Sequence, residues 1–116
     1  MKHIRVKLSP EAEEVYTYIN AQAPTSKLER MILNAVNQKI ELIKANTHYG
    51  DGIPKKLIPK EYITKYEVTN LFRVELPNFW RMLYTLTAEG DIEIIAFILD
   101  IIDHKTYDRK FGYRKK

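Results

Sequence analysis

The last residues of the chain, 103–116, read DHKTYDRKFGYRKK and combine several side chains that could do chemistry. They hold six Lys or Arg, two Tyr and one His, the residue type whose side chain most readily changes charge near neutral pH. Clustered cations attract a polyanion such as a nucleic acid, but a short basic run is also typical of a solvated tail. The choice between a nucleic-acid-binding end and a solvated tail therefore depends on the rest of the sequence.

Positive charge is concentrated at this end of the chain. Residues 104–116 carry a net charge of +5, because six Lys or Arg stand against Asp108 alone, and the other residues sum to −1 within the formal net charge of +4. A smaller basic excess lies in 55–65, KKLIPKEYITK. The uneven distribution favours a polyanionic partner, for which the C-terminal candidates are Lys105, Arg109, Lys110, Arg114, Lys115 and Lys116.

Length and composition limit the possibilities. The 116 residues, 45% of them apolar, predict one globular domain over 1–116. There is no cysteine, so thiolate chemistry is excluded, and the three histidines have no metal-ligand spacing, so we expect neither a metal nor another cofactor. No signal-like segment is present and no apolar run approaches the roughly 20 residues of a membrane span, so the predicted location is the cytoplasm, away from membranes.

The first half of the sequence predicts a strand followed by a helical hairpin. Alternating apolar residues over 3–9 indicate a half-buried strand. Ser9-Pro10 and the capping box that begins at Ser26 then predict the starts of two amphipathic helices. Residues 46–60 contain two Gly and two Pro without periodicity, which predicts a loop.

Three strands are predicted for the second half. A three-residue turn at 77–79 pairs Leu76 with Trp80 and Glu75 with Arg81, which keeps apolar residues on one face of the sheet. A second turn at 88–90, with Gly90 left-handed, would pair Tyr84 with Ile94. The predicted α+β fold is thus an N-terminal strand, a helical hairpin and a three-stranded antiparallel meander, forming one sheet with helices on one face. The other face would stay open and carry the arginines 73 and 81.

In this order of elements the sequence resembles toxins of the RelE/ParE superfamily, which belong to type II toxin–antitoxin systems. The matching residues are Leu71-Phe72-Arg73, Trp80-Arg81-Met82-Leu83-Tyr84 and the final His104-Lys105-Thr106-Tyr107, and the last of these is most similar to the HigB branch. About forty residues match in detail, and each motif is short. The specificity of the resemblance therefore comes from the order of the motifs.

The resemblance implies a metal-independent endoribonuclease that cuts messenger RNA, often on the ribosome, by attack of the 2′-OH on the neighbouring phosphate. Such chemistry needs a base, an acid and cations on the phosphate oxygens. By resemblance, Arg81, His104 and Tyr107 would be catalytic, with Arg81 as a phosphate clamp and Arg73 and Lys105 adding charge. Which of His104 and Tyr107 acts as acid or base stays open. The implied partner is a cognate antitoxin, small and either acidic or DNA-binding.

Alternatives remain, because this fold hosts more than one function. Some superfamily members act on DNA gyrase, and others are catalytically inactive and only bind an antitoxin or a nucleic acid. Lys105 stands where the superfamily often has an arginine, Arg81 could simply pair with Glu75, and Tyr107 could simply pack against the sheet. We expect residues 103–108 to finish the last strand and to place His104 and Tyr107 beside Arg81, while 109–116 supply phosphate affinity.

Overall fold

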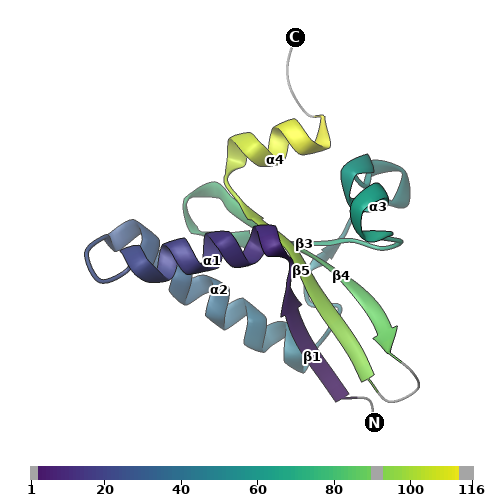
Figure 1. Cartoon of the computed structure of the whole chain (residues 1–116), viewed down its shortest axis with the longest axis horizontal. Helices are drawn as coiled ribbons and strands as arrows, with labels where there is room; N and C mark the ends of the chain where they lie inside the picture. Colours follow the sequence, from purple (N-terminus) through teal and green to yellow (C-terminus); the bar gives the residue numbers. More distant parts are fainter. Residues whose placement is uncertain (1–2, 90–92, 113–116) are drawn as a thin grey trace.

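The computed structural model describes residues 3–89 and 93–112, which form an α+β architecture on one five-stranded mixed sheet (Figure 1). In chain order the elements are β1 (His3–Leu8), α1 (Pro10–Gln22), α2 (Lys27–Ala45), β2 (Asp51–Gly52), α3 (Lys60–Tyr66), β3 (Phe72–Leu76), β4 (Trp80–Glu89), β5 (Glu93–Ile102) and α4 (His104–Phe111), with single 3-10 turns at Lys55–Leu57 and Pro77–Phe79. The strand order is β1-β5-β4-β3-β2, and neighbouring strands are antiparallel except β1, which runs parallel to β5.

The helical hairpin predicted from the sequence is present as α1 and α2. Ser9 caps α1 by accepting a hydrogen bond from the Ala12 amide, and Ser26 caps α2 in the same way through Glu29. The apolar stripes of both helices pack on one face of the sheet. This contact forms the first hydrophobic core, which includes Ile19, Ile32, Val36, Ile43, Val74, Met82, Tyr84 and Ile98.

The hairpin of β3 and β4 has the predicted register. Leu76 pairs with Trp80 and Glu75 pairs with Arg81, across the turn at 77–79. Alternate residues of both strands enter the first core, so any slip by one residue would turn apolar side chains away from it. The same register places the arginines 73 and 81 together on the other face of the sheet.

The predicted register of β4 with β5 is wrong by four residues. Tyr84 pairs with Ile98 and not with Ile94, and β4 continues through Ala88 to Glu89, which pairs with Glu93. Because a shift by an even number keeps each side chain on its face, the alternation in the sequence could not distinguish the two registers. A bulge between Leu83 and Tyr84 adds a further irregularity. Gly90 and Ile92, which belonged to the predicted turn and strand, lie outside the described residues.

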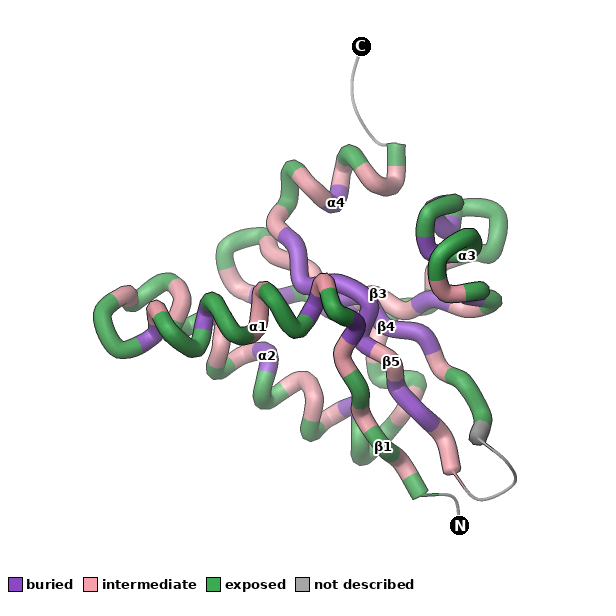
Figure 2. The backbone as a smooth tube through the Cα atoms, viewed as in Figure 1, coloured by how far each residue is buried: buried purple, intermediate pink, exposed green. Residues whose placement is uncertain are grey.

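The prediction of helices on one face only is also wrong, because α3 and α4 cover the second face. Tyr62 of α3 and Tyr107 of α4 pack with Leu83 and Leu99 of the sheet in a second core, which also contains Ile58, Val68, Leu71 and Ile102. The buried segments visible along the central strands reflect this covering on both sides (Figure 2). The helix α3 was not predicted from the sequence, since its seven residues carry little periodicity.

Residues 103–108 do not finish the last strand. The strand β5 ends at Ile102, and α4 begins at His104. Asp103 accepts a hydrogen bond from the Thr106 amide as the N-cap of α4, and Gly112 ends the helix with φ of 72°, a left-handed conformation that favours glycine. These two caps are sequence signals for a helix, and they override the strand that was predicted for 103–108.

No helix in the described ranges, 3–89 and 93–112, has the length and apolar character of a membrane span.

A buried polar group ties α4 to α3 and β5. The Tyr62 hydroxyl donates a 2.6 Å hydrogen bond to the Asp100 carboxylate, and the Lys110 ammonium lies 3.7 Å from the same oxygen and also pairs with Glu61. Burial raises the pKa of Asp100, and the Tyr62 hydrogen bond and the Lys110 charge oppose that shift. Lys110 therefore acts within the fold, as the counter-charge of a buried carboxylate.

Replacing Lys110 with methionine is expected to lower the free energy of unfolding at pH 7 by about 2 kcal/mol, because Asp100 would lose its cation. Since the folded state of the variant would hold the Asp100 proton more tightly than the unfolded state, its stability should fall as pH rises above about 4. Urea unfolding across this pH range measures both effects. Adding Asp100→Asn should remove the extra pH dependence, and an unchanged slope in the double variant would contradict this assignment.

Candidate nucleic-acid site on β3, β4 and α4

Two arginines from adjacent strands converge on one tyrosine of α4. The Arg73 Nη1 donates a 3.0 Å hydrogen bond to the Tyr107 hydroxyl. The guanidinium carbon of Arg81 lies 5.1 Å from the centre of the Tyr107 ring, and that of Arg73 lies 5.9 Å from it. The register of β3 and β4 and the capped start of α4 create this arrangement. We call Arg73, Arg81 and Tyr107 the arginine–tyrosine cluster.

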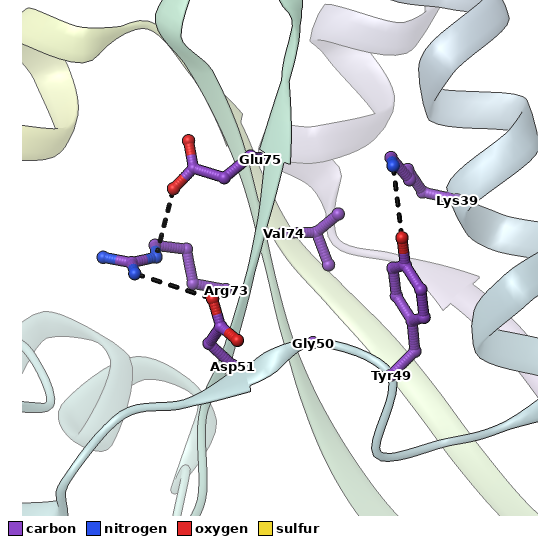
Figure 3. A pocket seen from close by; sticks show the side chains of 7 residues that line it. All are labelled: Lys39, Tyr49, Gly50, Asp51, Arg73, Val74 and Glu75. Carbon is purple, nitrogen blue, oxygen red and sulfur yellow. Dashed lines mark hydrogen bonds and ion pairs between the residues drawn. The ribbon is translucent and has the colours of Figure 1, made fainter.

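Glu75 bridges the two arginines of the cluster. Its carboxylate oxygens lie 3.4 Å from Arg73 Nε and 3.3 Å from Arg81 Nε. Arg73 also lies 3.7 Å from Asp51, at the edge where β2 meets β3 (Figure 3). The hydrogen bond to Tyr107 raises the pKa of Arg73, so this guanidinium stays charged throughout the physiological range. The pairing of Arg81 with Glu75 that the sequence left open is therefore present.

The two Nε–H groups in the cluster have unmet hydrogen-bonding capacity. Both Nε atoms are buried, and neither has a hydrogen-bond partner among the described residues, because Glu75 lies at ion-pair distance without the required bond geometry. Buried donors normally find an acceptor. An oxygen-rich anion that reached both arginines would supply one, and arginine's planar fork suits phosphate oxygens.

Tyr107 is buried, whereas His104 is exposed. The Tyr107 side chain packs in the second core and stacks on Phe111. The His104 side chain is 55% exposed at the start of α4, and its Nε2 lies 3.2 Å from the Asp108 carboxylate one turn along the helix. The structure thus places Tyr107 beside both arginines and sets His104 at the rim of the same region, where its ring lies 6.2 Å from the ring of Phe79.

The remaining predicted cations divide into three groups. Lys105 and Arg109 are exposed on α4. Lys110 is turned inward to Asp100 and Glu61, so its ammonium is occupied. Arg114, Lys115 and Lys116 lie outside the described residues. Of the predicted tail cations, Lys105 and Arg109 are therefore the two that are exposed on the described surface.

A shallow pocket of about 260 Å³ adjoins the cluster at the edge of β3. Figure 3 shows Arg73 and Glu75 on one side of β3, while Val74 points to the other side, toward Tyr49 and Lys39. The Lys39 ammonium donates a 3.2 Å hydrogen bond to the Tyr49 hydroxyl. Asp51, Lys39 and Tyr49 were not predicted as site residues, because the sequence of 46–60 indicates only a loop and Lys39 lies on the polar side of a helix.

Within residues 3–89 and 93–112, no group of three or more His, Asp or Glu side chains is arranged to hold a metal ion. The arginines, the tyrosine and the histidine are instead suited to bind an anion and to transfer protons.

Comparisons with models of protein families, with curated proteins and with solved structures found no match to this chain.

Proposed function

We propose that this protein is the toxin of a toxin–antitoxin pair and cleaves messenger RNA, free or on the ribosome, without a metal ion. The observation that carries the proposal is the convergence of Arg73 and Arg81 on Tyr107, with two buried Nε donors that have no acceptor among the described residues. The RelE/ParE resemblance supplies the reaction class, and the arrangement of strands β3 to β5 before α4 is compatible with it.

In the proposed reaction, the scissile phosphate takes the place of the Glu75 carboxylate between the two guanidinium groups. The RNA 2′-oxygen attacks phosphorus while a base removes its proton, the bond from phosphorus to the 5′-oxygen breaks, and an acid protonates that oxygen. The products are a 2′,3′-cyclic phosphate and a 5′-hydroxyl. Arg81 and Arg73 stabilise the charge that develops on the phosphate oxygens, and Tyr107 orients Arg73.

His104 and Tyr107 remain the candidates for proton transfer. His104 is accessible and lies beside Asp108, which can orient its ring. Tyr107 has its hydroxyl within the cluster itself, where it accepts a hydrogen bond from Arg73. This arrangement favours His104 as the group that exchanges protons with solvent and Tyr107 as the group nearest the phosphate.

Glu75→Gln is expected to strengthen binding of single-stranded RNA by about tenfold, because the carboxylate competes with phosphate for the two arginines. Glu75 is exposed, so it can swing away, and glutamine keeps its length without the charge. Fluorescence anisotropy with a labelled oligonucleotide measures the change. The matched control is Glu41→Gln, which removes a carboxylate from an exposed ion pair on α2. Equal effects from both variants would mean that net charge alone is responsible.

A second function is favoured by one specific observation. Tyr107 is 2% exposed and both arginines already have carboxylate neighbours, an arrangement that is also expected of a binding module without catalysis. Such a module would bind RNA and leave it intact. Gyrase-directed toxicity is the other alternative, which would stop growth while messenger RNA stays full-length.

Induced expression in bacteria tests the proposal against both alternatives. The ribonuclease proposal predicts slower growth together with shortened messenger RNA. Slower growth with intact messenger RNA would favour a gyrase-directed toxin, and unaffected growth would favour the binding module. The proposed partner is an acidic antitoxin, for which the exposed Lys105 and Arg109 of α4 offer complementary charge.

A further inference from the structure

Phe79 combines two unusual properties in the turn between β3 and β4. Its side chain is 71% exposed, the largest exposure among the large apolar residues that stand out at the described surface. Its backbone is left-handed with φ of 63°, directly after Asn78 with φ of 59°. Asparagine tolerates this conformation, whereas a bulky residue there is strained. Neither burial nor backbone preference explains a phenylalanine at this position.

The position of Phe79 links it to the arginine–tyrosine cluster. Its carbonyl oxygen accepts a 2.8 Å hydrogen bond from Arg81 Nη1, so the turn and the arginine hold each other in place. Its ring lies 6.2 Å from the ring of His104, at a tilt of 56°. An exposed aromatic ring therefore stands at the rim of the site, near the imidazole of His104 and on the turn whose carbonyl binds Arg81.

We infer that Phe79 is a stacking platform for a base of single-stranded RNA, next to the phosphate held by Arg73 and Arg81. Exposed aromatic rings beside cations are the usual means by which proteins hold unpaired bases, since every base offers a flat face. Strain of the kind seen at Phe79 is typical of functional positions. The inference rests on the proposed function and names its substrate more closely as unpaired RNA with a base splayed beside the scissile phosphate.

A base suits the surroundings of the ring better than an apolar protein surface does. The ring lies near the imidazole of His104, and the backbone carbonyl of Phe79 itself is held by Arg81. An apolar protein surface placed here would cover these polar groups without supplying an anion for the arginine. A nucleotide supplies a phosphate for the arginine and a base for the ring together. One bound nucleotide thus uses both neighbouring groups.

The test compares Phe79→Gly with the full-length wild type, using an unstructured fluorescent RNA of eight nucleotides. Glycine removes the ring and accepts the left-handed backbone without strain, so the thermal midpoint should be unchanged or higher. RNA affinity should nevertheless fall by about fivefold or more, the lower end for stacking on one base. Phe79→Trp should retain the affinity, and Tyr18→Ala, at an exposed aromatic of α1, should have no effect.

An abasic scan of the same RNA identifies the partner of the ring. Removing the base at one position should weaken wild-type binding as much as Phe79→Gly does. The same abasic RNA should bind to Phe79→Gly no more weakly than the intact RNA does. The inference would be overturned if Phe79→Gly bound the RNA as tightly as the wild type, if that variant had a lower thermal midpoint, or if removing the ring and removing the base had independent effects. The proposed function would stand in each of these cases. If the wild type neither binds nor cuts RNA, the proposed function fails, and this inference fails with it.

Discussion

Replacing Arg81 with lysine should reduce the rate of RNA cleavage by about 100-fold or more while the fold is retained. The side chain is 14% exposed, lies over the Tyr107 ring and hydrogen-bonds the turn at Phe79. Lysine keeps the charge and much of the length, but it cannot contact two phosphate oxygens with a planar fork. Loss of one such group from a transition state typically costs this much.

The matched control for Arg81→Lys is Arg5→Lys. Arg5 pairs with Glu93 between β1 and β5, where its side chain is 48% exposed. The measurement is single-turnover cleavage of a labelled RNA at saturating protein, with circular dichroism to confirm the fold. A small loss in both variants would show that Arg81 contributes charge only. Loss of folding in Arg81→Lys would show that its main role is to hold the turn.

Tyr107→Phe is expected to have an effect of similar size, about 100-fold, for a different reason. Phenylalanine keeps the ring that packs on Phe111 and under the two guanidinium groups, but it removes the hydroxyl that Arg73 contacts. Arg73 would lose its orientation toward the phosphate, and any proton transfer through that oxygen would stop. Tyr62→Phe is the control, since it removes a buried hydroxyl from the same core outside the cluster.

A substrate with sulfur as the leaving atom separates the roles of Tyr107 and His104. Thiolates leave without protonation, so the variant that lacks the acid should regain much of its rate on an RNA with a 5′-bridging sulfur. His104→Ala and Tyr107→Phe are compared on both substrates. Recovery in one variant only identifies the acid. Recovery in neither would place both residues outside the protonation of the leaving group, and full activity of both variants on ordinary RNA would reject the ribonuclease proposal.

The parts of the fold that the sequence predicted are those with strong local or alternating signals. Ser9 and Ser26 carry cap signals that the structure uses. The register of β3 with β4 followed from the short turn between them, because the strands on both sides of it alternate apolar and charged residues and only one pairing keeps the apolar residues on one face. The register of β4 with β5 could not be predicted, because both strands are long and apolar and any even shift preserves the faces.

The candidate site was predicted in part. The sequence placed Arg73 and Arg81 on one face and Glu75 opposite Arg81, because the first hairpin fixes them. It placed Tyr107 near Arg81, but on a strand beside an open face, whereas the residue lies on a helix that closes that face. The Asp103 cap was the signal for this helix. The contributions of Asp51 and Phe79 depend on tertiary packing and on a left-handed backbone, which residue types alone do not reveal.

The most direct test of the proposed ribonuclease is the end-group chemistry of RNA cut by the purified protein in the presence of EDTA, with free RNA and with translating ribosomes as substrates. The proposed mechanism predicts fragments ending in 2′,3′-cyclic phosphate and 5′-hydroxyl, which form undiminished in EDTA and about 100-fold more slowly with Arg81→Lys. Cleavage that disappears with EDTA, fragments with 5′-phosphate ends, or intact RNA in both substrates would contradict it.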